Sequence, residues 1–269
     1  MLDLITYNVC WECMTGTSNV ASKAAEYGGR CACVPRRSPV AGRSNRCFAN
    51  VVRILSHRAF DVIAIQEGSH ALAAAVRAQL ERAHRTTYGV VIRNTGRAVA
   101  IVLYKRATLM PLGDAVLDLV YVRGNGVEGR PMMAQRFATA HGTLAVVACH
   151  CPHERYVLPD NLRRVLTRVG SAAGDDVVVI GDFNRAQRRS IRVEGRRGLL
   201  RPCNRMATAW NVHGEGYRAA VDNVLVSDRL RPHRVETLSN AHTLLPLDAR
   251  LRNLTSDHTP VAAQLGYAP

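Results

Sequence analysis

The sequence predicts an α/β protein in which two mixed β-sheets pack against each other and helices cover their outer faces. Three observations lead to this prediction. Apolar segments typical of strands outnumber those with helical periodicity, short turns join consecutive strands, and helices occur singly between groups of strands. These features favour antiparallel hairpins within each sheet over a doubly wound parallel sheet.

The N-terminal part begins with a predicted strand at residues 4–9, LITYNV. Residues 11–45 are rich in Gly, Ser, Arg and Cys without hydrophobic periodicity, which predicts a long loop insertion. Two apolar sets at helical spacing then predict helices on either side of a buried strand at residues 61–67, DVIAIQE. The two sets are Phe48, Val51, Val52, Leu55 and Ala59, followed by Leu72, Ala75, Val76 and Leu80.

Two hairpins are predicted in the middle of the chain. The first joins strands at residues 88–94 and 98–106 through the tight turn NTGR. The second joins residues 129–140 to residues 143–150, with His141-Gly142 at the turn.

The last part of the chain begins with a third predicted helix, which is followed by the buried strand DVVVIGD at residues 176–182. The helix is marked by Leu162, Val165, Leu166 and Val169. Residues 185–205, rich in Arg and Gly, predict a loop, and strands are predicted at residues 220–227 and 259–265.

The chain of 269 residues, 47% of them hydrophobic, is long enough for a large core, and no linker or internal repeat divides it. We therefore expect a single domain spanning residues 1–269. No apolar run is long enough to cross a bilayer, and the N-terminus lacks the pattern of a signal peptide. We expect a soluble, intracellular protein that acts as a monomer.

The formal net charge is +15, and almost all of the basic residues are arginines, since Lys23 and Lys105 are the only lysines. Arginine pairs with phosphate oxygens through two parallel hydrogen bonds, so this balance favours nucleic acid or another phosphate-rich partner. The alternative is a solvated basic surface without a specific ligand.

The eight cysteines do not indicate a disulfide framework, because no secretory signal accompanies them. Four could hold a zinc ion, but Cys-x-Cys followed by a lone cysteine after thirteen residues is not a standard zinc spacing. We favour reduced thiols and leave the zinc site open. The four residues are Cys13, Cys31, Cys33 and Cys47.

Polar residues suited to chemistry stand at the boundaries of several predicted strands. They are Asn8, Glu67, His150, Asp182, Asn184, Asp222, Asp257 and His258. Carboxylates at the rim of a sheet can share a hard cation such as Mg²⁺, and histidines beside them can transfer protons near neutral pH. Each residue alone could belong to an ordinary turn or surface, but the complete ordered set is hard to attribute to chance.

The ordered motifs TYNV, IAIQE, ACH, IGDFN, VDNVLVS and SDHTP resemble the endonuclease/exonuclease/phosphatase superfamily, the DNase I-like metal-dependent phosphodiesterases. The resemblance runs from residue 4 to about residue 265, and GDFN and SDH are its most specific parts. It implies a four-layer α/β sandwich, with two packed mixed sheets flanked by helices and the active site at one end. It also implies hydrolysis that depends on Mg²⁺, with Mn²⁺ as an alternative ion.

The resemblance implies a role for each matching residue. Glu67 would be the main Mg²⁺ ligand, with Asn8 beside it and Asp257 contributing to the same site. Asp182 and Asn184 would position the scissile phosphate and the attacking water, or a second metal ion.

The two histidines would do the proton chemistry. His258, held by Asp222, would contact the phosphate as acid or base, and His150 would stabilise the transition state or protonate the leaving oxygen. Such groups meet a physical need, since an anionic phosphodiester repels nucleophiles unless its charge is neutralised and a water is placed in line. A side chain that transfers the proton typically contributes about 10² to 10⁴ in rate.

The sequence also departs from one branch of the superfamily. Abasic-site endonucleases usually carry an Asp two residues after the first Asn and a Tyr-x-Pro-Asn segment, where this chain has Cys10 and HCPH.

The loop that follows Asn184 could contact substrate phosphates, foremost through Arg185 and Arg188, or could be an ordinary solvated loop. Its other arginines in this hypothesis are Arg189, Arg192, Arg196 and Arg197.

We therefore expect a Mg²⁺-dependent phosphodiesterase, foremost a nuclease or DNA-end-processing enzyme that acts on nucleic acid. The alternative is a phosphatase or phospholipase-type enzyme for inositol phosphates or sphingomyelin, although no hydrophobic membrane-docking loop is evident. A non-catalytic nucleic-acid-binding module ranks lowest, because all the catalytic residues are present. The sequence leaves open DNA against RNA, endo- against exonucleolytic action, and one metal ion against two.

Overall fold

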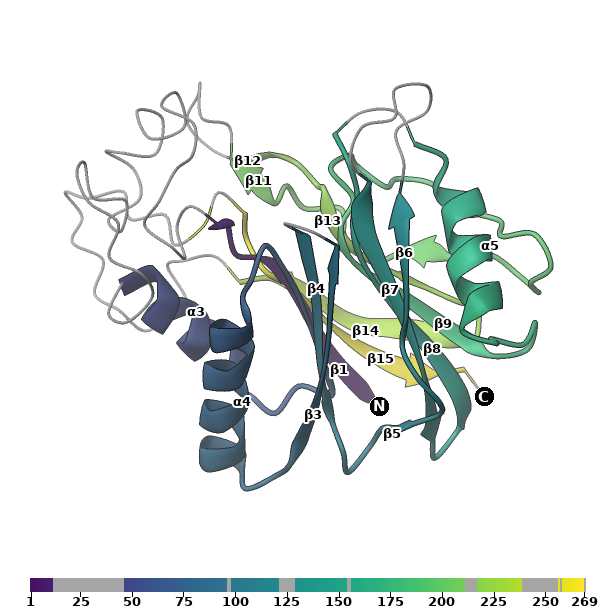
Figure 1. Cartoon of the computed structure of the whole chain (residues 1–269). Coiled ribbons are helices and arrows are strands. Elements are labelled where there is room, and N and C mark those ends of the chain that lie inside the picture. The colour runs from purple at the N-terminus through teal and green to yellow at the C-terminus, as the bar shows by residue number, and fades with distance from the viewer. Residues whose placement is uncertain are drawn as a thin grey trace.

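The structure, a computed structural model, describes residues 1–11, 46–95, 98–120, 129–153, 156–210, 217–238, 256 and 258–268. Its centre is formed by two mixed β-sheets that pack face to face (Figure 1). The six-stranded sheet has the order β14-β15-β1-β2-β4-β3, in which β1 and β2 are parallel and the other neighbours antiparallel. Its strands are β1 (Leu2–Asn8), β2 (Val62–Gln66), β3 (Tyr88–Thr95), β4 (Ala98–Lys105), β14 (Leu230–Thr237) and β15 (Val261–Tyr267).

The second sheet has the order β10-β13-β9-β8-β7-β5, with β6 also paired to β7. Its one parallel pair joins β8 to β9. Its strands are β5 (Met110–Pro111), β6 (Val116–Val120), β7 (Arg130–Thr139), β8 (Gly142–His150), β9 (Asp176–Asp182), β10 (Arg201–Pro202) and β13 (Asp222–Val226). A small hairpin of β11 (Ala209–Trp210) and β12 (Tyr217–Ala219) forms a separate pair.

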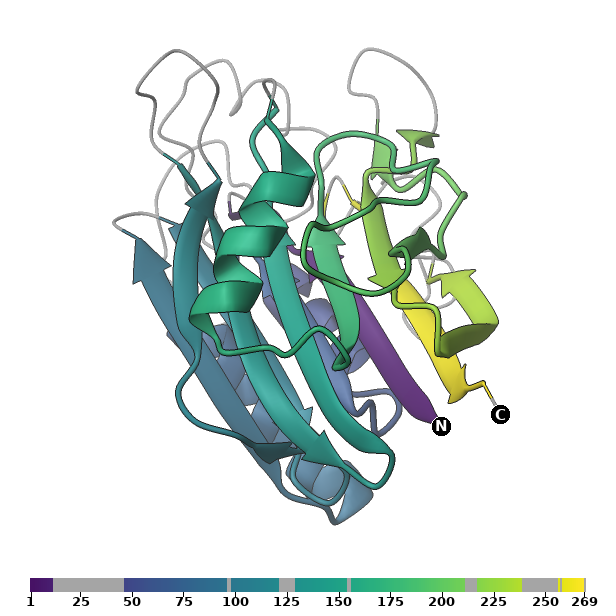
Figure 2. The ribbon, with the colours of Figure 1, turned by 90° about the vertical axis from the view of Figure 1, so that its right-hand side faces the viewer.

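Helices cover the outer faces of both sheets, so the predicted four-layer sandwich is confirmed. The helices α3 (Arg46–Leu55) and α4 (His70–His84) lie on the six-stranded sheet, and α5 (Leu158–Arg168) lies on the other (Figures 1 and 2). The N-terminus of α4 is capped by Ser69, whose hydroxyl accepts a hydrogen bond from the N–H of Leu72 at 3.1 Å.

Three buried apolar clusters separate the four layers. Alternation along β1 shows how one strand supplies two of them, because Leu4 faces the other sheet while Ile5 and Tyr7 face α3 and α4. The third cluster lies under α5 and includes Leu162 and Val165, two of the residues that predicted this helix.

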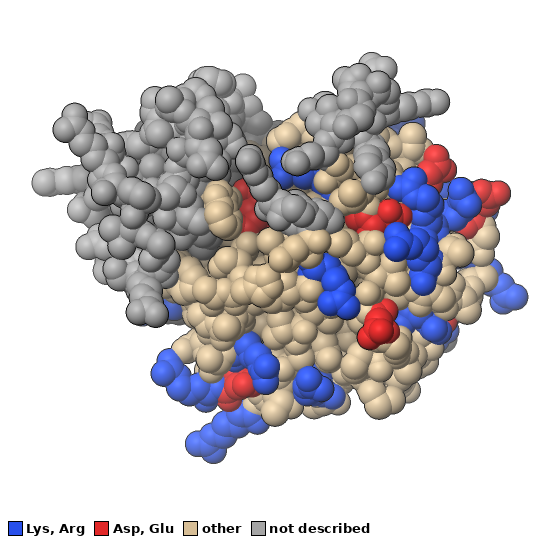
Figure 3. All heavy atoms as spheres, in the orientation of Figure 1, with Lys and Arg blue, Asp and Glu red and all other residues tan. Residues whose placement is uncertain are grey.

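Ion pairs add to the packing of α5. Arg164 and Arg168 of this helix lie 3.2 and 3.6 Å from carboxylate oxygens of Asp118 in β6. The face of the molecule that includes α5 accordingly shows basic side chains next to acidic ones (Figure 3). Within the described residues, no helix is long and apolar enough to cross a membrane.

The predicted hairpins are confirmed by the pairing of β3 with β4 and of β7 with β8. Other features differ from the sequence prediction. The strands β5, β6 and β14 were not predicted, the first helix ends at Leu55 rather than near Ala59, and the predicted loop at residues 185–205 contains the short strand β10. The predicted loop insertion lies, from residue 12 to residue 45, outside the described residues.

Strand direction brings the predicted site residues to one end of the sandwich. In the first sheet the parallel register pairs Asn8 with Gln66, so Glu67 follows at the same end. In the second sheet it pairs His150 with Asp182, and the antiparallel register pairs Asp182 with Asp222. The polar ends of strands that are far apart in the sequence therefore meet.

Candidate active site

Asp182 stands at the centre of the site. It is fully buried at the end of β9 and accepts a hydrogen bond from the side-chain amide of Asn8, with 2.9 Å between Asn8 Nδ2 and Asp182 Oδ2. The same oxygen lies 3.7 Å from His150 Nε2 and 3.9 Å from His258 Nε2. Burial raises the pKa of the Asp182 carboxyl group, and this outweighs the opposing effect of the two histidines.

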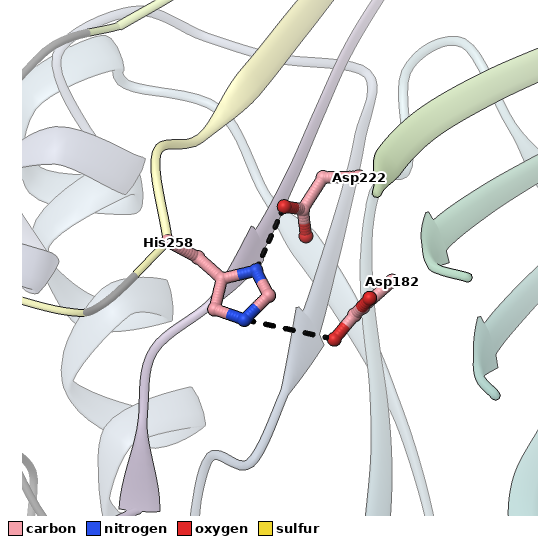
Figure 4. Close-up of side chains that lie close together, drawn as sticks. All are labelled: Asp182, Asp222 and His258. Atoms are coloured by element: carbon pink, nitrogen blue, oxygen red, sulfur yellow. Dashed lines mark hydrogen bonds and ion pairs between the residues drawn. The ribbon is translucent and has the colours of Figure 1, made fainter. Parts of the chain in front are cut away.

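His258 is oriented by a buried carboxylate. Its Nδ1 lies 2.8 Å from Oδ2 of Asp222, while its Nε2 faces Asp182 on the other side of the ring (Figure 4). A carboxylate at this position holds the hydrogen on Nδ1, which leaves Nε2 as the atom that can exchange a proton with a substrate.

The backbone around this pair is held by hydroxyl groups that the sequence analysis did not single out. Thr208 Oγ1 accepts hydrogen bonds from the N–H groups of Val221 and Asp222, at 3.2 and 3.0 Å. Ser256 Oγ accepts one from the N–H of His258 at 3.1 Å and donates one to the carbonyl oxygen of Asn8 at 2.7 Å. Ser256 thereby ties His258 to the end of β1.

Glu67 follows β2 in a left-handed backbone conformation, with φ of 59°. One carboxylate oxygen accepts a hydrogen bond from the N–H of Trp11 at 2.9 Å, and the other lies 3.7 Å from His150 Nε2. Burial opposes ionisation, but the positive charge of His150 and the Trp11 hydrogen bond outweigh it and lower the pKa of Glu67. Glu67 is therefore ionised at neutral pH, as its predicted role requires.

His150 ends β8 and is 4% exposed. Burial lowers the pKa of its imidazole, although the carboxylates of Asp182 and Glu67 act in the opposite direction. Arg130, at the start of β7, also lowers the pKa of both His150 and Glu67 through its charge. Sequence analysis missed Arg130, because nothing in GRPMM distinguishes it from the many other arginines.

Asn184 lies in a tight turn after β9, with φ of 51°. Its backbone N–H donates to Asp182 Oδ1 at 2.7 Å, and its side-chain amide donates to the carbonyl oxygen of Cys151 at 2.6 Å. The turn is thus of the Asx type and also belongs to the site. With Nδ2 engaged, the amide oxygen is the atom of Asn184 that can orient a water or an ion.

The acidic groups of the site fit a cation. Ligand atoms of Asp182, Asp222 and His258 all lie within 4.8 Å of one another, which makes this buried cluster a possible metal site. Asp222 Oδ1 is buried and has no hydrogen-bond partner among the described residues. A buried carboxylate oxygen without a donor is costly unless a cation or a proton faces it, so the donor set suits a hard divalent ion.

The other predicted ligands divide between the described and the undescribed parts of the chain. Asn8 and Glu67 lie at the same strand ends as the cluster, whereas Asp257 falls outside the described residues. The four cysteines for which a zinc site was left open also lie outside them, except for the backbone of Cys47 in α3. Cys149, Cys151 and Cys203 are free thiols.

The two predicted substrate-binding arginines differ in their surroundings. Arg185 stacks on the ring of Tyr156, with 3.7 Å from its guanidinium carbon to the ring centroid, and donates to the Tyr156 carbonyl oxygen at 2.7 Å. Arg188 is exposed and makes no ion pair or hydrogen bond within the described part of the chain. Arg185 directly follows Asn184, and Arg188 comes three residues later.

Solved structures of several proteins are similar to this chain. D. rerio TDP2, crystallised with a single-strand DNA product, is 13% identical with a TM-score of 0.61, and the match covers 98% of each chain. An endonuclease/exonuclease/phosphatase family protein from Bacteroides thetaiotaomicron is 15% identical with a TM-score of 0.65, over 100% of this chain and 98% of the other. ANGEL2, a 2′,3′-cyclic phosphatase, is 13% identical with a TM-score of 0.65, over 98% and 95%.

These identities are low, so the similarities show a shared fold. A comparison with curated protein sequences found no match. The profile of the Endonuclease/Exonuclease/phosphatase family, in contrast, matches residues 5–258, which is most of the chain and spans every strand end described above. The chain therefore belongs to the endonuclease/exonuclease/phosphatase family and is a hydrolase whose buried Asp/Asp/His cluster is consistent with a metal-binding active site.

Proposed function

We propose that the protein is a Mg²⁺-dependent phosphodiesterase that cleaves nucleic acid, as a nuclease or a DNA-end-processing enzyme. The observation that carries this proposal is the convergence of Asp182 with two histidines, at 3.7 and 3.9 Å from their Nε2 atoms. The hydrogen bond between His258 and a buried carboxylate adds to it. These groups meet the needs of phosphodiester hydrolysis, which are a place for a cation and atoms that accept and donate protons.

Glu67, Asn8 and Asp257 would hold the Mg²⁺ ion, for which Mn²⁺ could substitute. Their carboxylate and amide oxygens are of the ligand type that Mg²⁺ prefers. When bound, the ion supplies positive charge that offsets the negative charge of the phosphate. Asp182, Asp222 and His258 form a second candidate set, which would apply to a site with two ions.

Asp182 and Asn184 would orient the attacking water. The raised pKa of Asp182 makes its carboxylate a better proton acceptor than an ordinary aspartate. The turn that joins the Asn184 N–H to Asp182 Oδ1 holds the two side chains in a fixed relation. Hydrolysis then needs no flexible loop to bring these groups together.

His258 would exchange a proton with the phosphate oxygens through Nε2, since Asp222 occupies Nδ1. His150, whose Nε2 lies near the same carboxylate oxygen of Asp182, would donate a hydrogen bond to the leaving oxygen or to the phosphoryl oxygens on which negative charge develops. A neutral imidazole can do this through its remaining N–H, so the lowered pKa of His150 is compatible with the role.

Nucleic acid as the substrate is supported by the charge of +15 and by the predominance of arginine. Two proteins of similar fold were solved with nucleotide-derived ligands, TDP2 with a single-strand DNA product and ANGEL2 with adenosine-2′,3′-vanadate. Among the described residues, the exposed large apolar side chains are Met1, Trp11, Met110, Val157 and Met206. They do not form the continuous apolar segment that a lipid-hydrolysing enzyme would insert into a membrane.

A substrate panel in Mg²⁺ or Mn²⁺ tests the proposal. It contains plasmid DNA, an abasic duplex, 5′-tyrosyl DNA, poly(A), an inositol phosphate and sphingomyelin. We expect cleavage of at least one nucleic acid and its loss in EDTA and in His258→Ala. We also expect its loss in Glu67→Gln at Mg²⁺ concentrations that just suffice for the wild type. Hydrolysis of the inositol phosphate or sphingomyelin with all nucleic acids intact would replace this proposal by the phosphatase alternative. A panel left intact throughout would contradict both.

A further inference from the structure

The segment of residues 185–201, here called the basic segment, contains seven arginines and one glutamate. It begins immediately after Asn184 and ends in β10. A nucleic acid with its scissile phosphate at the active site would have its neighbouring phosphates within reach of the surrounding surface. The surroundings of each arginine decide whether its side chain is available to bind these neighbouring phosphates.

Three arginines of the basic segment are occupied by contacts within the protein. Arg185 packs on Tyr156. Arg196 is half-buried and donates hydrogen bonds to Ser171 Oγ at 3.0 Å and to the carbonyl oxygen of Asp175 at 2.6 Å. Arg201 lies 3.5 Å from Asp228.

The inward position of Arg196 corrects the hypothesis that it contacts phosphate. Its guanidinium anchors the basic segment to the turn between α5 and β9. Burial lowers the pKa of its guanidinium, as expected for a group withdrawn from water.

The four remaining arginines are exposed and, within the described part of the chain, make no ion pair or hydrogen bond. They are Arg188, Arg189, Arg192 and Arg197. The arginines of α5 contrast with them, because Arg164 and Arg168 pair with Asp118. Glu194, the one acidic residue of the basic segment, lies 3.6 Å from Arg163 of α5. Exposed cations in excess over anions produce a positive potential that attracts polyanions.

The scaffold under these four arginines is ordered. Ile191 and Leu200 exchange two backbone hydrogen bonds, at 2.9 and 2.8 Å, which close the basic segment into a hairpin. Val193 and Leu200 are buried in the cluster under α5. Gly198 has a φ of 73°, and a Cβ there would lie 2.0 Å from a carboxylate oxygen of Asp228. The backbone therefore holds its shape without a ligand, which lowers the entropic cost of binding.

We propose that the basic segment binds the sugar-phosphate backbone of a nucleic acid outside the scissile position, through Arg189, Arg192 and Arg197. The proposal rests on the proposed function, since it names the substrate as an extended nucleic acid rather than a small phosphoester. The hairpin starts after Asn184 and leads away from the site toward the start of β9, where Arg196 bonds Asp175 and the N–H of Leu199 bonds Asp228. Its exposed guanidinium groups would therefore meet phosphates several nucleotides from the scissile one, which they match in charge and donor geometry. None of the exposed large apolar side chains lies in the basic segment, which disfavours a membrane surface.

The test compares the variant Arg189→Gln/Arg192→Gln/Arg197→Gln with wild type and with a matched control. The control removes three exposed arginines at the far end of the sheets, near the starts of β1 and β2, namely Arg85, Arg106 and Arg231. Both variants lose the same net charge, so a difference between them reports position. Binding of a fluorescent 30-mer DNA is measured by anisotropy from 50 to 200 mM salt, together with its cleavage.

We expect the triple variant to lower the slope of log K against log salt by about 2.7, since each lost phosphate contact removes about 0.9 for duplex DNA. This difference corresponds to wild-type binding that weakens about 40-fold more than variant binding between 50 and 200 mM salt. Hydrolysis of bis(p-nitrophenyl) phosphate, which is too small to reach the basic segment, should stay within twofold of wild type. The slope of log K against log salt for the control should differ from the wild-type slope by less than about 0.9, the change expected for one lost phosphate contact.

Equal slopes for the triple variant and the control would overturn the inference and leave only a solvated basic surface. Loss of binding to vesicles with 30% phosphatidylserine, with DNA binding unchanged, would also overturn it in favour of a membrane surface. The proposed function fails separately, if the wild-type protein hydrolyses the small ester and leaves every nucleic acid intact.

Discussion

Replacing Asp222 with asparagine keeps the shape of the side chain and removes the charge that faces the His258 ring. The 2.8 Å contact between Asp222 Oδ2 and His258 Nδ1 is shielded from water, because both side chains are buried. A hydrogen bond to a charged group contributes about 1.5–3 kcal/mol. Since about 1.36 kcal/mol corresponds to a factor of ten in rate, its loss in the transition state should lower kcat/KM by about 10- to 160-fold.

Initial rates on the substrate found in the panel, at saturating Mg²⁺, give kcat/KM for wild type and Asp222→Asn. The Mg²⁺ concentration at half-maximal rate is measured for both, and thermal unfolding checks that the variant is folded. Asp114→Asn is the matched control, since Asp114 is exposed and makes no hydrogen bond or ion pair within the described residues. We expect the control to behave as wild type.

An Asp222→Asn enzyme within twofold of wild type would refute the reasoning that Asp222 acts through His258. A change in the Mg²⁺ dependence would instead make the Asp222 carboxylate a metal ligand. If the half-maximal Mg²⁺ concentration rises more than tenfold and the rate recovers at high Mg²⁺, Asp222 is a metal ligand, as the Asp182, Asp222 and His258 cluster permits.

Three further changes have expected outcomes. Glu67→Gln should raise the Mg²⁺ concentration that gives the half-maximal rate at least about tenfold, because it removes a charged ligand. An unchanged Mg²⁺ titration would exclude Glu67 as a ligand. EDTA should abolish the activity of the wild type. Thr208→Val should lower the free energy of unfolding in urea by about 1–3 kcal/mol, because two buried N–H groups lose their acceptor, and Thr208→Ser should not. Gly181→Ala should cost about 3 kcal/mol or more, because its Cβ would lie 2.0 Å from the Cys149 carbonyl oxygen, whereas Gly174→Ala meets open space and should be near neutral.

The elements that sequence analysis predicted are those with a continuous buried face. The strand β9 is buried along its whole length, and the apolar set of α5 lies in the cluster beneath it. The strand β14 was missed because four consecutive residues from Arg231 to Arg234 are exposed, so the apolar alternation of a half-buried strand is absent. The strand β14 forms because it pairs with β15 at the edge of the sheet. That partner lies further along the chain, so the local sequence of β14 does not indicate the pairing.

The site was predictable where a residue ends a strand, because strand direction carries Asn8, His150 and Asp182 to the same end of the sandwich. Thr208 and Ser256 could not be found in this way, since their hydroxyl groups act on backbone atoms of residues distant in the sequence or outside any strand. The arginines of the basic segment show a further limit. Neighbouring residues of the same type, one anchored inside the protein and one exposed, look alike until the packing of the chain separates them.

Whether a single metal-dependent site at these strand ends hydrolyses nucleic acid can be measured with one labelled substrate. Wild type and His258→Ala, purified in parallel and shown by circular dichroism to be equally folded, are incubated with the best nucleic acid of the panel in Mg²⁺. We expect products from wild type alone, and none from wild type after chelation. Equal product formation by His258→Ala, or by wild type in excess EDTA, would contradict the central claim that His258 and a divalent ion act together at this site.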